Sequence, residues 1–129
     1  MILELWIKDA GRRMPPLTIN LGRNLSDGTY LPMYTSFLDV RHPLYEQALQ
    51  TFSALGLAQP YEKNGHPWTQ TSGFSTYPLY QFHRIALERM DPKGCVLYEQ
   101  GYLLAYRSQS MVDACKAQVH KVEGFEETL

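Results

Sequence analysis

The side chains that most often carry chemistry are scattered along this sequence. None of the four histidines forms an HxH or HxxxH pair with another, which is the spacing that brings two imidazoles to one metal ion. They are His42, His66, His83 and His120. Each also has an ordinary structural interpretation, such as the end of a helix for His120. We therefore expect no metal site and no cofactor.

The two cysteines, Cys95 and Cys115, show neither a CxxC spacing nor the density of a disulfide scaffold. A thiol enzyme would need one of these cysteines to be accessible to solvent and to lie beside a histidine base. The apolar pattern instead predicts that both are buried. The sequence therefore predicts two buried thiols, which is typical of the reducing cell interior.

No other catalytic motif is present in the sequence. There is no GxSxG elbow, and the glycines form neither GxGxxG nor GxxxxGKS/T. Five acidic residues are candidates for acid–base work by residue type alone: Asp27, Asp39, Glu46, Glu62 and Glu88. Scattered carboxylates on a near-neutral protein are usually solvated, so we predict no catalytic residue.

Aromatic residues are the most prominent chemical feature. The chain has nine Tyr, five Phe and two Trp, many of them between residues 30 and 82. Tyr and Trp bring a large contact area at low entropic cost and keep a polar tip, which is why they populate binding hot spots. We predict a partner-binding surface made of Tyr30, Tyr34, Tyr61, His66, Trp68 and Phe74.

Four of these residues lie in the segment 58–75, which shows no sustained period and contains two prolines and two glycines. We predict a long loop there, and long loops in compact domains are commonly functional or mobile. Two interpretations of its aromatic residues stay open. They form a mixed polar and aromatic binding surface, or they fold back and fill a gap over the sheet.

Composition and charge limit the classes of protein to which this chain can belong. With 44% apolar and 19% charged residues, the chain has enough apolar material for one domain over residues 1–129. Its 12 basic residues balance 13 acidic ones, so no global field favours a nucleic acid or an anionic membrane. No stretch approaches the ~20 apolar residues of a membrane span. We expect a cytoplasmic protein without a signal peptide or transmembrane helix.

Hydrophobic period and turn residues predict the N-terminal elements. These are strands over residues 2–8 and 17–21 that pair with each other, a loop over 22–28, an edge strand or extended arm over 30–38 and a helix over 43–55. The strand over 30–38 is placed at an edge because Pro32 lacks the N–H of a central ladder position. Gly56 marks the end of the helix.

The C-terminal half completes the predicted fold. Its expected elements are a helix over 76–90, a hairpin with strands 95–98 and 102–106 around Gly101, and a helix that opens at Ser110 and ends at Gly124. This order lacks the regular strand and helix alternation of a parallel α/β sheet. We therefore predict an α+β fold with a mainly antiparallel sheet of four to five strands and about three helices packed on one face.

A small, near-neutral, reduced domain without catalytic motifs is typical of a protein-binding module. Our hypothesis is a non-enzymatic intracellular inhibitor of the immunity or antitoxin type, which neutralises a toxin or effector protein by occluding its active surface. The occluding surface would be the 58–75 segment and the Tyr30–Phe37 arm. Formation of a homo-oligomer also stays open.

Two other functional classes stay open. A small hydrolase or transferase would assemble a histidine and a carboxylate only in the fold, with His66 or His83 as the base. The only basic hints of a small-ligand or nucleic-acid module are Arg12, Arg13, Arg23 and Arg41. A histidine within about 3 Å of a carboxylate in a closed pocket would favour the enzyme. An exposed apolar patch without such a pocket would favour the binding module.

Overall fold

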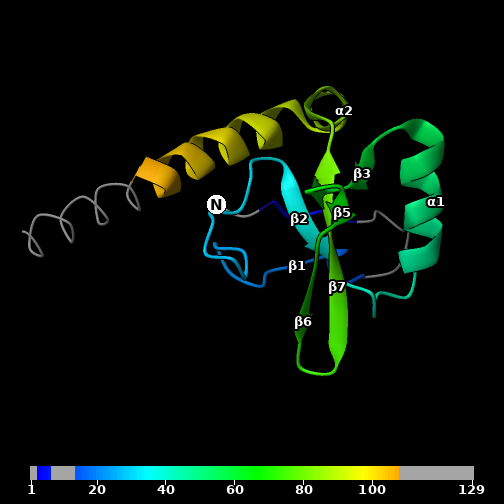
Figure 1. Cartoon of the computed structure of the whole chain (residues 1–129). Coiled ribbons are helices and arrows are strands. Elements are labelled where there is room, and N and C mark those ends of the chain that lie inside the picture. Colours follow the sequence, from blue (N-terminus) through cyan, green and yellow to red (C-terminus); the bar gives the residue numbers. More distant parts are fainter. Residues whose placement is uncertain (1–2, 7–13, 108–129) are drawn as a thin grey trace, which may run out of the picture.

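A central strand, β7, organises the sheet (Figure 1). The structure is a computed structural model that describes residues 3–6 and 14–107. Within these residues, one antiparallel sheet is made of β1 (Thr18–Ile19), β2 (Thr35–Leu38), β3 (Ala58–Pro60), β6 (Thr69–Ser72) and β7 (Ser75–Phe82). The strand order is β1, β2, β7, β3, and β6 pairs with the first half of β7. Two further strands, β4 (Glu62–Lys63) and β5 (His66–Pro67), pair with each other.

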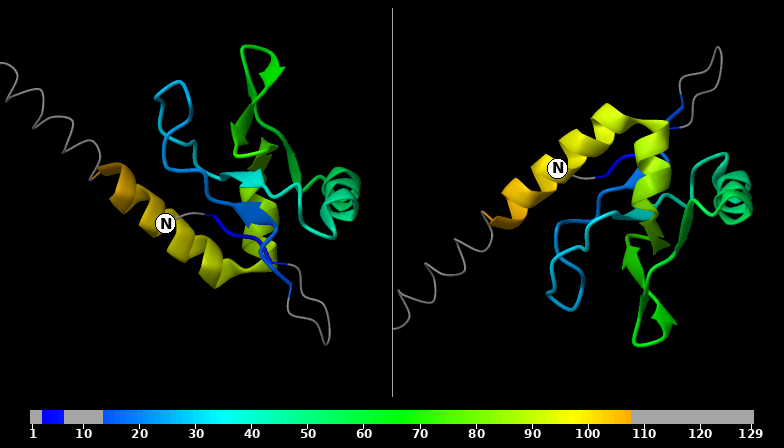
Figure 2. Two further views of the ribbon diagram at one scale, coloured as in Figure 1. Left: turned by 90° about the horizontal axis from the view of Figure 1, so that it is seen from below. Right: turned by 90° about the horizontal axis from the view of Figure 1, so that it is seen from above.

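Three helices accompany the sheet in the described part of the chain: α1 (Tyr45–Leu55), α2 (Arg84–Met90) and a helix over residues 92–107. α1 ends at Gly56, whose φ of 62° lies in the left-handed region that glycine adopts without steric cost. In Figure 2 the 92–107 helix runs beside the N-terminal segment, away from α1. Among the described residues, no helix combines the length and the apolar character needed to cross a bilayer.

The helices share one face of the sheet. Phe82 of β7 belongs to a hydrophobic cluster that contains Ala48 and Phe52 from α1, Leu87 from α2 and Tyr98 from the 92–107 helix. Side chains of a strand alternate between the two faces of its sheet, so this cluster lies on the face to which Phe82 points. The predicted α+β fold with a mainly antiparallel sheet is confirmed.

A loop covers the opposite face of the sheet. The cluster on that face consists of Leu25, Phe37, Tyr77 and Leu79, and Tyr61 and Trp68 pack against it. Leu25 belongs to the predicted loop over residues 22–28, where a backbone bond from the Gly28 N–H to the Leu25 carbonyl at 2.9 Å closes a turn. The loop therefore supplies core as well as a connection.

The N-terminal segment (residues 3–6) follows the predicted alternation without forming a regular strand pair. Leu3 is buried and Leu5 is half-buried, whereas Trp6 is exposed. The Leu17 N–H donates to the Leu5 carbonyl at 2.8 Å, which ties the segment to the chain beside β1. β1 forms its ladder with β2 and not with this segment.

The prediction of an edge strand over residues 30–38 is wrong, because β2 lies between β1 and β7. Pro32 precedes the strand, which begins only at Thr35, so its missing N–H removes no ladder bond. All four residues of β2 are buried, as expected for a strand with neighbours on both edges.

The prediction of one long loop over residues 58–75 is also wrong. The segment contains β3, β4, β5 and β6, and each of these strands is only two to four residues long. Strands this short show too few alternations to produce a period. Their backbone groups bond across the sheet, as the Tyr61 N–H does to the Leu79 carbonyl at 2.9 Å.

The helix predicted over residues 76–90 exists only in its second half. Ser75–Phe82 is β7, in which Tyr77 and Leu79 are buried by strand alternation. A helix over 76–90 with Leu79 and Phe82 on its inner face would also turn Ile85 inward, yet that side chain is 63% exposed. Pairing along both edges of β7 decides the conformation, because tertiary contacts override weak local preferences.

The hairpin predicted over residues 95–106 is wrong, because residues 92–107 are helical. Cys95, Tyr98 and Tyr102 lie three and four residues apart and face the interior together. A glycine inside a helix, here Gly101, costs only about 1 kcal/mol relative to alanine. Burial of a tyrosine such as Tyr98 outweighs that cost. The helix predicted from Ser110 lies outside the described residues.

Candidate partner-binding surface

The 92–107 helix begins with an N-terminal cap, which Asp91 provides. The Asp91 carboxylate accepts a hydrogen bond from the Gly94 N–H at 3.0 Å, which satisfies one of the free donors of the first turn. A Cβ atom at Gly94 would lie only 2.3 Å from Asp91 Oδ2. Gly94 therefore allows the carboxylate to fold back over the helix start, and Pro92 suits the same turn because that turn needs no N–H from it.

Tyrosines attach this helix to residues 30–34, the arm that precedes β2. The hydroxyl of Tyr98 accepts a hydrogen bond from the Tyr34 N–H at 2.9 Å, and the hydroxyl of Tyr102 donates one to the Leu31 carbonyl at 2.8 Å. The Tyr30 ring meets the ring of Tyr102 edge-on, with centroids 5.6 Å apart. The arm therefore positions the inner face of the helix.

An ionic cluster also links the 92–107 helix to Tyr34 and to α2. Glu99 Oε1 accepts hydrogen bonds from the Tyr34 hydroxyl and from Arg84 Nε, the latter at 2.7 Å. The Tyr34 hydroxyl and the Arg84 guanidinium hold the pKa of Glu99 below its usual value. Burial and then the Glu99 carboxylate raise the pKa of Tyr34. At neutral pH the carboxylate is therefore charged and the phenol keeps its proton, as a structural link requires.

Cys95 lies beside this cluster as a buried free thiol, as predicted. Its sulfur is 3.8 Å from Glu99 Oε1. Burial, followed by the nearby carboxylate, raises the pKa of the thiol. A protonated, buried thiol is a poor nucleophile, so this position gives no support to thiol catalysis. Cys115 lies outside the described residues.

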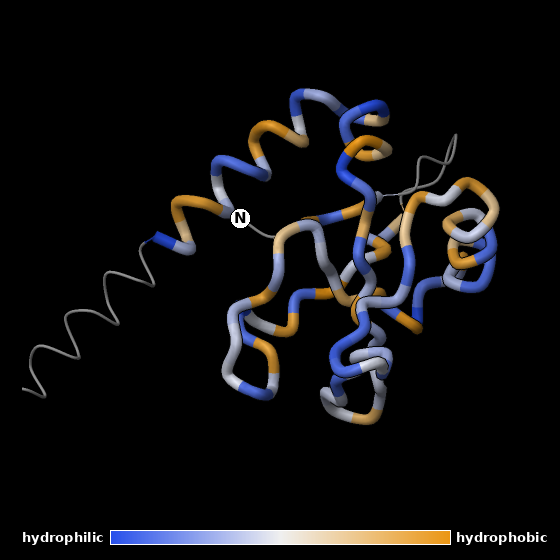
Figure 3. The backbone as a smooth tube through the Cα atoms, turned by 45° about the horizontal axis from the view of Figure 1, so that its top comes forward, coloured by the Kyte–Doolittle hydropathy of each residue, from blue (hydrophilic) through white to orange (hydrophobic). Residues whose placement is uncertain are grey.

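The outer face of the 92–107 helix carries a row of seven exposed side chains, four of which are aliphatic. We call this row the outer stripe, and its members are Lys93, Val96, Leu97, Gln100, Leu103, Leu104 and Arg107. The four aliphatic members are between 43% and 65% exposed. Hydrophobic positions recur along this helix in Figure 3. The helix is therefore apolar both toward the core and away from it, whereas a surface helix usually has one polar face.

An open groove of about 550 Å³ lies next to the helix start. The N-terminal segment forms one wall, and α2 and the 92–107 helix form the other. Most of its lining is apolar, including Leu5, Trp6, Leu87, Met90 and Tyr98. The groove joins the exposed Met90 of α2 to Trp6, which is 59% exposed, and none of the residues that line it belongs to the outer stripe.

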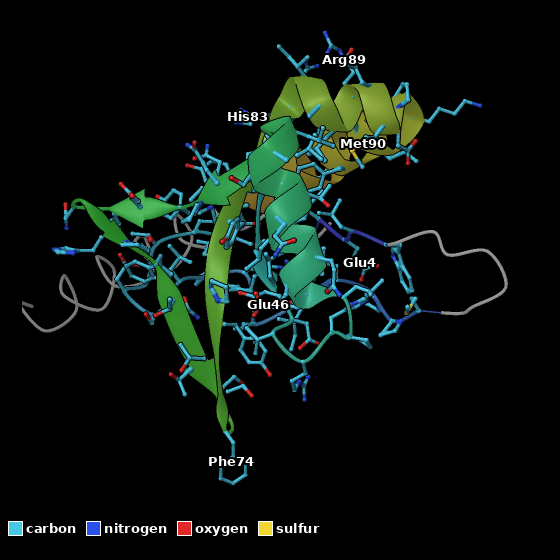
Figure 4. All side chains as sticks on the ribbon, turned by 90° about the vertical axis from the view of Figure 1, so that its right-hand side faces the viewer. Glu4, Glu46, Phe74, His83, Arg89 and Met90 are labelled. Atoms are coloured by element: carbon cyan, nitrogen blue, oxygen red, sulfur yellow. The ribbon has the colours of Figure 1, made fainter. Side chains whose placement is uncertain are left out.

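A second exposed aromatic feature lies at the tip of the β6–β7 hairpin. Gly73 adopts a φ of 63° in this turn, a conformation that favours glycine. The neighbouring Phe74 is fully exposed. Figure 4 shows Phe74 pointing away from the body, at the far end from Arg89 and Met90 of α2.

The structure divides the six residues predicted to bind a partner. His66 and Phe74 are exposed. Tyr61 and Trp68 are half-buried against the second cluster, so these two fill a gap over the sheet. Tyr30 and Tyr34 contact the 92–107 helix, through the Tyr102 ring and the Glu99 carboxylate respectively. The predicted residues thus do not form one surface in the described part of the chain.

The three histidines in the described part of the chain do not form the geometry that an acid–base enzyme requires, and His120 lies outside it. His42 is buried, with Nε2 3.1 Å from the Pro15 carbonyl and Nδ1 accepting a bond from the Leu44 N–H at 3.0 Å. His66 and His83 are exposed, and neither bonds to a carboxylate among the described residues. No group of three metal-binding side chains exists within residues 3–6 and 14–107.

The outer stripe was missed because residues 95–106 were assigned to a hairpin. A signal was present in the sequence. Lys93, Leu97, Gln100, Leu104 and Arg107 recur at spacings of four, three, four and three, which is the period of one helix face. The buried residues Cys95, Tyr98 and Tyr102 follow the same period on the other face.

No family model matches this sequence, and the searches of curated proteins and of solved structures found no similar protein.

Proposed function

We propose that this protein is a non-enzymatic protein-binding module of the cell interior, and that it binds its partner through the outer stripe of the 92–107 helix. The observation that carries the proposal is the exposure of Val96, Leu97, Leu103 and Leu104 along one helix face. Exposed apolar side chains that gather on one surface mark interaction sites more often than isolated ones do.

The free energy of burial supports this choice of surface. Complete burial of a leucine or valine contributes roughly 1.5–3 kcal/mol, so covering the exposed half of each side chain contributes on the order of 1 kcal/mol. Covering four such side chains in one row therefore contributes roughly 4 kcal/mol.

Inhibition by occlusion is the mode of action that we propose for this module, as for an immunity protein or antitoxin. Phe74 would serve as a second contact, because a fully exposed ring on a two-stranded hairpin is already positioned to enter a partner's cleft. The buried free thiol of Cys95 agrees with a cytoplasmic location. A toxin or effector enzyme is the partner class that this mode implies.

Capture from native lysate with quantitative mass spectrometry tests the proposed function. The bait proteins are the wild type, the stripe variant Leu97→Glu/Leu104→Glu and the tip variant Phe74→Ala. Leu55→Glu is the matched control, because Leu55 is 67% exposed but lies at the end of α1. Circular dichroism checks that each variant is folded.

We expect one stoichiometric partner whose recovery falls at least tenfold with the stripe variant, about threefold with the tip variant and not with the control. A partner that the folded stripe variant retains at wild-type level would contradict the proposal. Turnover of a small-molecule substrate by the purified protein would also contradict it.

A further inference from the structure

We infer that the outer stripe receives an acidic amphipathic helix of another protein, and not a second copy of this chain. The inference rests on the proposed function, because it names the kind of partner for the same surface. Two observations carry it: the spacing of the stripe residues and the sign of their charges.

The spacing fits a helix as the occupant. Lys93, Gln100 and Arg107 lie seven residues apart, and so do the pairs Val96 with Leu103 and Leu97 with Leu104. A repeat of seven keeps its residues on one side of a helix, as a seam between two helices requires. In this stripe Val96 with Leu97 and Leu103 with Leu104 form two aliphatic steps, and Gln100 lies between them. The stripe spans two heptads, or about 21 Å at 1.5 Å per residue.

The charges of the stripe have one sign. Lys93 and Arg107 lie at its two ends, and neither makes an ion pair with another described residue. Its central polar residue is the neutral Gln100. Two acidic residues lie near the stripe in the described sequence, and both are engaged elsewhere. Glu99 is turned to the inner side, where it bonds to Tyr34 and Arg84, and the Asp91 carboxylate accepts the Gly94 N–H at the helix start. The stripe is therefore apolar and basic.

This charge pattern disfavours a second copy. In a parallel pair in register, Lys93 would face the same lysine of its partner, and Arg107 would face the same arginine. In an antiparallel pair centred on Gln100, Lys93 would face Arg107 at both ends. Like charges across a helix seam are unfavourable, so both arrangements disfavour self-association.

A partner helix with carboxylates near both ends of an aliphatic seam complements these features. Its aliphatic side chains would cover the four exposed aliphatic residues, and its Asp or Glu residues would pair with Lys93 and Arg107. Charge complementarity of this kind selects among apolar partners and speeds association. The occupant is thus defined by its chemistry, as an amphipathic helix with acidic flanks.

Two synthetic helical peptides of about 21 residues, or three heptads, test the inference. They share one leucine and alanine seam, and they carry either glutamates or lysines beside it. The full-length protein is titrated with each peptide by calorimetry at about 20 mM and about 500 mM salt. Analytical ultracentrifugation of the protein alone measures self-association.

We expect the acidic peptide to bind about tenfold more tightly than the basic one at low salt, and the difference to shrink at high salt. The charge-reversal variant Lys93→Glu/Arg107→Glu is expected to reverse the preference. Both substituted residues are exposed, so this variant keeps the packed side of the helix unchanged. Leu97→Glu/Leu104→Glu is expected to abolish binding of both peptides.

Equal binding of the two peptides, or binding of neither, would overturn the inference about the acidic helix. Self-association that the stripe variant abolishes would also overturn it. The proposed function fails by a different result, namely capture of the native partner by the folded stripe variant at wild-type level. The two failures are therefore distinguishable.

Discussion

The backbone N–H of Tyr34 donates a hydrogen bond to the hydroxyl of Tyr98 at a distance of 2.9 Å. The two residues are 64 positions apart in the sequence. Tyr34 has a φ of 63°, and the Phe82 N–H of β7 donates to its carbonyl at 2.8 Å. One residue thus links the central strand to the helix that carries the outer stripe.

Tyr98→Phe is expected to lower the free energy of unfolding by about 1–3 kcal/mol, because it leaves the Tyr34 N–H without its acceptor in the protein interior. Tyr98 is only 5% exposed, so water replaces the lost hydroxyl poorly. Urea denaturation followed by circular dichroism measures the change. Tyr106→Phe is the control, because Tyr106 is 49% exposed. Equal stability of the two variants would show that the hydrogen bond contributes little.

Gly94→Ala is expected to destabilise the wild type by about 0.5–2 kcal/mol, because the new Cβ displaces the Asp91 carboxylate from its cap position. In an Asp91→Ala background the clash is absent, and the higher helix propensity of alanine is expected to raise stability by up to about 1 kcal/mol. Denaturation of the four proteins in this double-mutant cycle gives the coupling. The same effect of Gly94→Ala in both backgrounds would contradict the cap.

Glu99→Gln is expected to flatten the loss of stability in acid. The folded pKa of Glu99 lies below its unfolded value, chiefly through the Tyr34 hydroxyl and then Arg84, so the charged link stabilises the fold above the unfolded pKa. That contribution fades as the pH falls below about 4.3, the ordinary pKa of glutamate. Thermal unfolding from neutral pH to acid compares the variant with the wild type. Parallel curves would argue against a charged link.

The Cys95 thiol is expected to react with an aromatic disulfide reagent only as fast as the protein opens. It is 7% exposed, and burial raises its pKa, so the thiolate is both scarce and inaccessible at neutral pH. A Cys115→Ala background isolates the signal of Cys95. Reaction is followed by absorbance with and without denaturant. Rapid labelling of the native protein would mean that the helix start is open or that the thiol is activated.

Part of the fold was determined by the sequence itself. The helix over 43–55 was predicted because Ala48 and Phe52 are four residues apart and Gly56 follows, and α1 occupies Tyr45–Leu55. The loop over 22–28, the burial of Cys95 and the α+β class were also predictable. For the helix and the loop the signal is local, because period, turn residues and caps act within a few positions of the chain. The burial of Cys95 and the α+β class were predicted correctly although the hairpin over 95–106, which entered both predictions, is wrong.

Tertiary structure decided the central strand and the outer stripe. The hydrophobic spacing of residues 75–82 is compatible with a helix. They form a strand because β2 and β3 bond to the two edges of β7. The segment 92–107 is fixed as a helix by Tyr98 and Tyr102, whose hydroxyls bond to Tyr34 and Leu31. These partners lie more than 60 residues away, beyond the reach of any local pattern. The exposed aliphatic surface exists only because those distant contacts turn the other face of the helix inward.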